Sequence, residues 1–280
     1  NKTSLDFYLS ERSQALDEVV IQTDIEKINI KSTQMSVNKL TSKTIKQIPV
    51  VLGESDIIKS IILLPGVTSA GEGASGFNVR GGAADQNLIL LDEAIVFNSS
   101  HVFGFFSVFN PDVIKDVKLF KGGIPSKYGG RLSSVLDIYQ KEGNNKDFKL
   151  TGGIGLISSR ILAEGPLKKE KSSFLIGGRS SYAHLFLPLI DNDNKAYFYD
   201  LNTKVNFRLN KKNNIFLSAY FGKDVFGINN SFINKYGNAV TNIRWNHLYS
   251  DKLFSNLSLI YSDYFYGLIL DFVGFEWDSG

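Results

Sequence analysis

Cysteine is absent from the 280-residue sequence, so neither a disulfide bond nor a cysteine-ligated metal site can form. Histidine is scarce: His101, His184 and His247 are isolated from one another, so each is expected to have a structural role. No apolar run reaches the roughly 18 residues that a membrane-spanning helix requires. These absences exclude disulfide-stabilised folds, and we expect neither a metal nor another cofactor.

Charge is nearly balanced, with 31 basic and 28 acidic residues and a net charge of +3. The two signs are interspersed, and no basic cluster carries aromatic side chains in an RNA-reading pattern, so no nucleic-acid partner is expected. The sequence also shows neither a nucleophile–base pair nor a poised pair of carboxylates. We therefore predict no catalytic residues and expect that the protein is not an enzyme.

One glycine loop resembles a cofactor motif. Gly71–Gly76 reads GEGASG and matches the dinucleotide pattern G-x-G-x-x-G, with Asp92 about 20 residues further on. A dinucleotide site needs a strand before this loop and a helix after it. Here a predicted helix precedes the loop, and the β-like segment Phe77–Gly82 follows it. The better interpretation is an exposed glycine loop, with a soluble nucleotide-binding enzyme as the weakest alternative.

The first half of the chain mixes helical and β-like patterns. Four isoleucines at helical spacing predict a helix within Glu54–Leu64, which Pro65-Gly66 ends. Asn110-Pro111 favours one helical turn over Pro111–Lys115. Strands are expected at 87–91, 117–120 and 135–139, between glycine pairs that permit tight turns.

The second half is richer in aromatic residues, holding 23 of the 35 within residues 150–280. Between Tyr199 and Leu209 apolar and polar side chains alternate, as in a strand between lipid and a polar lumen or in any half-buried antiparallel strand. The expected strands are 147–158, 159–166, 172–182, 197–209, 214–224, 238–248 and 253–270. Short turns at 168–171 and 210–214 alternate with longer connections near 183–196 and 225–237. A soluble β-domain is the alternative.

Several sequence runs, in their order and spacing, resemble the plug domain of TonB-dependent outer-membrane receptors. They read SIILLPGV, NVRGG, NLILLDEAIVF and VIKDVKLFKGGIPSKYGGRLSSVLDI. The resemblance implies a mixed α/β plug domain followed by antiparallel transmembrane β-barrel strands. Some seven strands cannot close around a plug, because plugged transporters have about 22. The chain is therefore expected to be the N-terminal portion of a longer receptor.

The resemblance also implies a domain order. Residues 1–15 are expected to end a preceding small β-domain, since Ser4–Leu9 resembles the tail of the domain that precedes the plug in many Bacteroidota receptors. Residues 16–47 are expected to be a TonB-box-like segment and a polar linker. Residues 48–143 are the expected plug, and 144–280 the first, incomplete set of barrel strands. The chain opens without a signal peptide, so we interpret it as a mature or trimmed product.

Three groups of functional residues are predicted. The coupling segment resembles the TonB box and could instead be an ordinary edge strand; it comprises Leu16, Asp17, Glu18, Val19, Val20 and Ile21. The plug core is expected to contain Arg80, Gly81, Gly82, Gly122, Gly129 and Arg131. The guanidinium of Arg80 is expected to bind carboxylate or carbonyl groups, with an exposed arginine on a turn as the alternative. Ligand-facing plug loops are expected at Ser69, Glu72, Ser75, Asn98, Ser99 and His101.

The function implied is active uptake of a nutrient by a receptor in the outer membrane of a Gram-negative bacterium, with the N-terminus facing the periplasm. The implied partners are the TonB energising complex in the periplasm, outer-membrane lipid, an extracellular nutrient ligand and a surface lipoprotein. The alternative is a plug that gates or interacts within a larger outer-membrane complex and transports nothing itself. The substrate is not readable from the sequence.

Overall fold

The structure is a computed structural model that describes residues 36–48, 54–71, 76–182, 194–229 and 231–279. All of these residues belong to one compact unit, Gln34–Gly280. The predicted coupling segment Leu16–Ile21 and two predicted ligand-loop residues, Glu72 and Ser75, lie outside the described residues. The unit contains two parts, which we call the plug module (residues 37–143) and the wall (residues 149–279).

The plug module is built on a five-stranded sheet with the strand order β1-β8-β9-β4-β5. Strands β4 and β9 are parallel, and the other neighbours are antiparallel. The strands are β1 (Val37–Thr41), β4 (Asn87–Leu91), β5 (Ala94–Ile95), β8 (Ile114–Phe120) and β9 (Ser134–Gln140). Two separate two-stranded sheets accompany it: β2 (Val67–Ser69) with β3 (Phe77–Val79), and β6 (Ser100–His101) with β7 (Phe106–Ser107). The three strands predicted in this half are confirmed.

Helix α3 (Ile57–Ile62) confirms the predicted helix. Ile57, Ile58 and Ile61 are buried, which fits one apolar face against the sheet. Asp56 caps the helix, because its side chain accepts a hydrogen bond from the backbone N–H of Lys59 at 3.0 Å. The expectation that the second part of residues 16–47 is a polar linker is wrong from Val37 onward. There the chain forms β1, paired with β8, and helix α2 (Ser42–Gln47), because Ile45 is buried in the core. The predicted helical turn at Pro111–Lys115 is also wrong: a hydrogen-bonded turn leads directly into β8.

The wall is an antiparallel sheet of eight described strands in sequence order. They are β10 (Lys149–Ile154), β11 (Ser158–Lys168), β12 (Ser172–Ser181), β13 (Lys195–Arg208), β14 (Asn213–Ile228), β15 (Phe232–Ser250), β16 (Leu253–Leu270) and β17 (Phe275–Ser279). The predicted short turns near 168–171 and 210–214 are confirmed. The long connection expected at 225–237 is wrong, because β14 and β15 remain paired up to Ile228 and Phe232. Its polar residues continue the period-two pattern and are not a loop signal.

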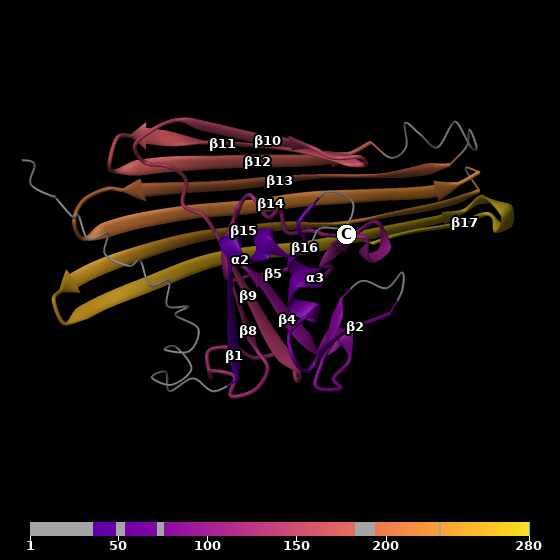
Figure 1. The fold of residues 1–280 in the computed structure, drawn as a ribbon, viewed down its shortest axis with the longest axis horizontal. Coiled ribbons are helices and arrows are strands. Elements are labelled where there is room, and N and C mark those ends of the chain that lie inside the picture. The colour runs from indigo at the N-terminus through magenta and orange to yellow at the C-terminus, as the bar shows by residue number, and fades with distance from the viewer. Residues whose placement is uncertain (1–35, 49–53, 72–75, 183–193, 230, 280) are drawn as a thin grey trace, which may run out of the picture. The chain divides into compact units, whose positions relative to one another are not determined.

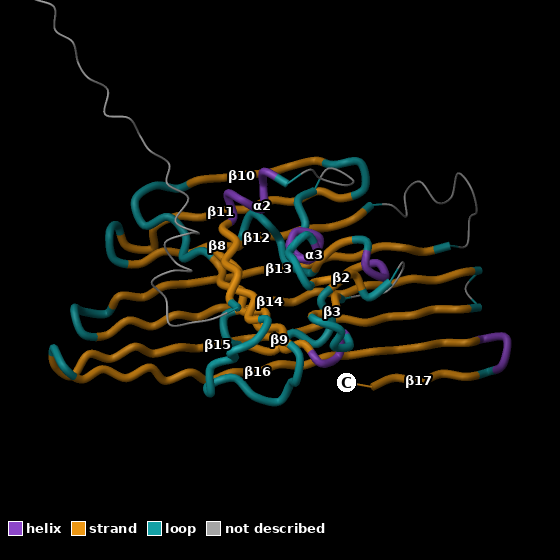
Figure 2. The backbone as a smooth tube through the Cα atoms, turned by 60° about the horizontal axis from the view of Figure 1, so that its bottom comes forward, coloured by secondary structure: helices purple, strands orange, loops and turns teal. Residues whose placement is uncertain are grey.

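The two faces of the wall differ in chemistry. Asp200, Asn202 and Lys204 are buried on one face, whereas Tyr199 and Leu201 are 41% and 48% exposed on the other. The alternation predicted for this strand is confirmed, with the polar side chains facing the plug module. Figures 1 and 2 show the plug module on one side of the wall, with its strands crossing the direction of the wall strands. Among the described residues, no helix is long and apolar enough to span a membrane.

The apolar core joins the two parts. The main cluster contains the plug isoleucines together with Tyr220 of β14 and Val240 of β15. A second contact places Val113 of the plug module against Leu162 and Leu175 of the wall. The plug module is therefore packed on the wall as well as hydrogen-bonded to it.

Candidate functional site at the plug–wall interface

His101, at the end of β6, lies between two wall strands and is 1% exposed. Its Nδ1 is 2.6 Å from Oδ2 of Asp224 on β14, and its Nε2 is 3.2 Å from Oδ2 of Asp200 on β13. The imidazole stacks on Phe198, with ring centroids 4.2 Å apart. Burial disfavours the charged imidazole, but the two carboxylates outweigh it and raise the pKa of His101 above its ordinary value. The geometry favours an imidazolium bridging two carboxylates.

Arg179 of β12 continues this network. Its guanidinium donates to Oδ2 of Asp200 at 2.6 Å and to Oε1 of Glu54 at 2.5 Å. A third hydrogen bond reaches the carbonyl of Ser107 in the plug module at 2.8 Å. The side chains of Arg179, Glu54 and Asp200 are 1%, 3% and 0% exposed, so the pairs are shielded from salt and water. The network thus joins plug carboxylate, wall arginine, wall carboxylate and plug histidine in one chain of contacts.

A second anchor is the β4–β5 turn. Asp92 and Glu93 both have positive φ, 47° and 75°, which non-glycine residues adopt only where the surroundings hold them. Asp92 binds Nζ of Lys204 at 2.9 Å, and Glu93 binds Nη1 of Arg244 at 3.1 Å. The carbonyl of Asp92 accepts a hydrogen bond from Nδ2 of Asn242 at 2.5 Å. Burial raises the pKa of Asp92, and Lys204 opposes that shift. The wall therefore holds the strained turn from two strands, β13 and β15.

A third anchor is Asp112, which receives Nζ of Lys46 at 2.5 Å and Nε of Arg160 at 2.6 Å. Burial would raise its pKa, but these two cations outweigh burial and hold the pKa of Asp112 below its ordinary value. Lys46 lies on α2 of the plug module and Arg160 on β11 of the wall. Asp112 therefore ties the first helix of the module to the wall.

The loop after His101 is strained at the tip of the module. Val102 and Phe103 have φ of 48° and 51°, and positive φ is costly for a β-branched residue. The wall holds this backbone: Val102 N–H donates to Oδ1 of Asp224 at 2.9 Å, and Phe103 N–H donates to the hydroxyl of Tyr236 at 3.2 Å. Beside the loop lies a cavity of about 670 Å³, whose lining includes Lys59, Phe103, Phe105, Phe106 and Ser69. A cavity lined by aromatic side chains, with the cation of Lys59 beside them, suits an amphipathic ligand.

The residues predicted for the plug core are mostly at its surface. Arg80, Gly81, Gly129 and Arg131 are exposed, and Gly82 and Gly122 are half-buried, so the prediction of a buried group is wrong. The predicted acceptor for Arg80 is also wrong, since its guanidinium donates to the hydroxyl of Ser36 at 3.1 Å. The physical reason is that Arg80 sits at a turn with φ of 50°, which points the side chain out along the surface. The buried arginine with carboxylate and carbonyl acceptors is Arg179.

A side chain at two of these glycine positions would approach neighbouring atoms closely. A Cβ on Gly82 would lie 2.3 Å from Oγ of Ser133, and one on Gly122 would lie 2.9 Å from Nη1 of Arg80. Gly129 has no described neighbour of this kind within 4 Å and an ordinary φ. Close packing therefore explains the motif glycine at 82. At 122 the guanidinium of the exposed Arg80 can move aside, and at 129 nothing lies close.

The predicted ligand-loop residues separate into two groups. Ser69 is exposed beside the 670 Å³ cavity, as a ligand-facing position requires. Asn98 is half-buried, Ser99 is 4% exposed and His101 is 1% exposed, so the last two do not face solvent. Asn98 is held by Asn238 of β15, whose Oδ1 accepts from its backbone N–H at 3.2 Å. The expectation of a free loop is wrong here, because this segment is an attachment to the wall; the structural role expected for His101 fits this position.

Sequence reasoning missed the wall half of the site: Arg179, Asp200, Lys204, Asp224 and Arg244. A usable signal was present in β13, where Asp200 and Lys204 fall on the face expected to be polar. A charged residue on the plug-facing side of a wall strand needs a partner, and His101 for Asp200 and Asp92 for Lys204 were available in the plug module. In the part of the chain that the structure describes, no group of three or more His, Asp or Glu residues could hold a metal ion.

Residues 29–134 match the family model described as TonB-dependent Receptor Plug Domain, which is less than half of the chain. No curated protein matches the sequence. Among solved structures, the siderophore receptor PirA from Pseudomonas aeruginosa has a TM-score of 0.61 at 18% identity, covering 84% of this chain and 42% of that one. The alcaligin outer-membrane receptor FauA from Bordetella pertussis has a TM-score of 0.61 at 12% identity, covering 85% of this chain and 40% of that one.

The copper transporter OprC is similar at a TM-score of 0.57 and 11% identity, covering 83% of this chain and 37% of that one. The chain thus spans less than half of the length of each of these structures. Together the family match and the structural neighbours confirm the predicted fold class: a plug domain followed by antiparallel strands, as in the N-terminal part of a TonB-dependent plugged barrel.

Proposed function

We propose that this chain is the plug and the first barrel strands of an outer-membrane receptor that takes up a nutrient with energy from the periplasmic TonB complex. The observation that carries the proposal is the way the plug module is held. Buried ion pairs at His101, Glu54 and Asp92 fix it to the polar face of the wall. Removing one member of such a pair leaves the other charge buried without a partner, which strongly destabilises the protein. A plug so held blocks the path until work is done on it.

A location in the outer membrane determines where the energy for uptake can come from. The outer membrane has no nucleotide supply of its own, so force has to come from the periplasm. We assign that contact to Leu16–Ile21, which precedes the plug and is rich in residues that favour strand addition. The Bacteroidota type, suggested by Ser4–Leu9, and a surface lipoprotein partner belong to this proposal. Ligand capture is assigned to the cavity beside Ser69 and Phe105, which lies at the tip of the plug module.

A disulfide tether tests whether the plug moves. A Cβ on Gly177 of β12 would lie 2.7 Å from Cγ2 of Val113 in the plug module, which places the two Cβ atoms within reach of a disulfide. The sequence contains no cysteine, so Val113→Cys with Gly177→Cys would introduce a unique pair. The full-length protein carrying this pair would be expressed in cells with and without TonB. Uptake and surface binding of labelled ferric siderophores, cobalamin, oligosaccharides and peptides would then be measured.

We expect TonB-dependent accumulation of one ligand class, blocked by the oxidised tether and restored by reductant, while binding persists. The matched controls are Val113→Cys alone and the reduced double variant, and both should transport normally; Gly177→Cys alone is not used, because its Cβ would clash with Val113. Uptake that is independent of TonB, or unaffected by a fully formed tether, would contradict the proposal. Binding without any uptake by the untethered protein would favour the alternative, a gating component of a larger complex.

A further inference from the structure

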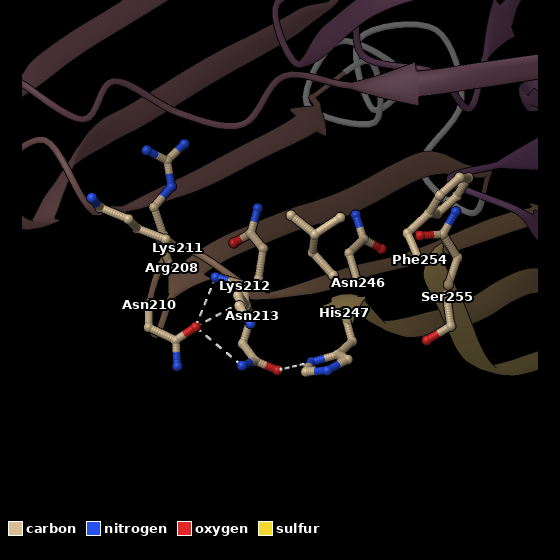
Figure 3. Close-up of a pocket in the computed structure, with 12 residues that line it drawn as sticks. Arg208, Asn210, Lys211, Lys212, Asn213, Asn246, His247, Phe254 and Ser255 are labelled. Carbon is tan, nitrogen blue, oxygen red and sulfur yellow. Dashed lines mark hydrogen bonds between the residues drawn. The ribbon is translucent and has the colours of Figure 1, made fainter. Parts of the chain in front are cut away.

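A second cavity, of about 500 Å³, lies at the turn end of strands β13 to β16, away from the ion pairs that hold the plug (Figure 3). Arg208, Lys211 and Lys212 line it from the β13–β14 hairpin. No acidic residue is among the described residues that line it. Within the described part of the chain, none of these three cationic side chains has a hydrogen-bond or ion-pair partner. Three cations around one cavity repel one another unless an anion enters.

The hairpin that carries these cations is rigidly built. Oδ1 of Asn210 accepts hydrogen bonds from the backbone N–H groups of Lys212 and Asn213, both at 2.9 Å. Asn213 is in turn fixed to the next strand, because its Oδ1 accepts from Nε1 of Trp245 at 3.0 Å and lies 2.7 Å from Nδ1 of His247. The backbone positions of the lysines are thus set in advance, which lowers the ordering cost of binding.

Two amides complete the cavity. Asn214 of β14 and Asn246 of β15 stand directly opposite each other in the strand register, and both line the cavity. The side-chain oxygen of each is buried without a partner among the residues that the structure describes. An amide that rotates by a half-turn presents its N–H groups instead, so this pair can donate to an oxyanion. Figure 3 shows Arg208 and Asn246 on the side of the strands opposite His247, consistent with strand alternation.

We propose that this cavity is a binding site for an oxyanion, a phosphate or carboxylate group. Arg208, Lys211 and Lys212 supply the charge, and Asn214 and Asn246 supply hydrogen bonds. Arginine forms paired hydrogen bonds to both groups, and fixed amides add directional donors. Arg208 and Asn246 lie on the face of the wall that carries the plug, because they alternate in step with Lys204 of β13 and Asn242 of β15. A dissolved anion is therefore the favoured source, and the phosphate of a lipid headgroup is the other.

The test uses the full-length protein in a neutral glycoside detergent free of phosphate. Binding of inorganic phosphate is measured by isothermal titration calorimetry for the parent protein and for Arg208→Gln with Lys212→Gln. The matched control is Lys168→Gln with Lys171→Gln, which removes the same charge from the neighbouring β11–β12 turn. We expect the cavity variant to bind phosphate at least about tenfold more weakly and the control to be unchanged. A third variant, Asn246→Ala, keeps all cations and should weaken binding to a lesser degree.

A lipid arm distinguishes the two sources. The same proteins are placed in bilayer discs of phosphatidylcholine with or without phosphatidylglycerol, and retained lipid is quantified by mass spectrometry after detergent extraction. The site would be assigned to a lipid headgroup if the parent and the control variant retain phosphatidylglycerol, the cavity variant does not, and the parent does not bind inorganic phosphate. Absence of both kinds of binding, or equal loss in the control variant, would overturn the proposal. Native mobility on gels confirms that each variant is folded before binding is measured.

Discussion

Nδ1 of His101 lies 2.6 Å from Oδ2 of Asp224, and the backbone N–H of the next residue, Val102, binds the other oxygen of the same carboxylate. One wall side chain thus fixes both the imidazole and the strained backbone that follows it. This arrangement couples the protonation of the histidine to the geometry of the plug tip. It also gives Asp224 of β14 two separate contacts with the plug module.

The contact should make plug retention depend on pH. The pKa of His101 is raised in the folded protein by Asp224 and Asp200, despite burial. A raised pKa means that stability is fully present below the ordinary value of 6.5 and is lost as the pH rises through the folded-state value. Thermal unfolding of the full-length protein, measured as a function of pH, should show this loss. The hydroxyl of Tyr220, 3.4 Å from Nε2, also faces the imidazole.

The variant His101→Gln isolates the effect. It should be less stable than the parent at low pH. Its stability should not fall further as the pH rises, whereas that of the parent should. His247→Gln, at the turn end of the wall, is the control and should keep the parent profile. An unchanged pH profile in His101→Gln would show that the titration of this imidazole does not control the stability of the protein, which would contradict the prediction.

Arg179 should be the most costly single residue to remove from the interface. Arg179→Met leaves the buried Glu54 carboxylate without its cation, and breaking one side of a buried pair costs about 3–5 kcal/mol of unfolding free energy. Arg179→Lys keeps the charge but cannot reach Glu54, Asp200 and the Ser107 carbonyl together, so an intermediate loss is expected. Denaturant unfolding with limited proteolysis of the plug measures both. Equal stability of the methionine variant and the parent would contradict the role given to this residue.

Gly143 should tolerate no side chain. It joins the plug module to the wall with φ of 77°, and a Cβ there would lie 2.3 Å from the carbonyl oxygen of Phe174. Gly143→Ala therefore combines a left-handed backbone with a backbone clash and should lower the unfolding free energy by more than about 1 kcal/mol. Gly129→Ala is the control, with an ordinary φ and open space, and should change stability by less than about 0.5 kcal/mol. Equal effects of the two substitutions would contradict this account.

The sequence carries local information well and long-range pairing poorly. Helix α3 was predictable because its isoleucines repeat at helical spacing, and β13 because Asp200 and Lys204 alternate with apolar residues. The burial of His101 was not predictable, because it depends on Asp224, which is 123 residues away along the chain. The NVRGG run marks Arg80, whereas Arg179 lies in a strand sequence without a recognisable motif. Contacts across the plug–wall interface are set by register and packing, which no local pattern encodes.

The last prediction concerns coupling through the segment 16–21, which lies outside the described residues. Strand addition to a periplasmic partner would use its backbone N–H groups, so Val20→Pro removes one donor and fixes φ. We expect full-length receptor with this change to bind ligand normally but to lose uptake, because the barrel and plug remain folded. Ser32→Pro, in the polar stretch that follows, is the matched control and should transport as the parent does. Unchanged uptake in Val20→Pro would mean that the segment is an ordinary strand and that the energising contact lies elsewhere.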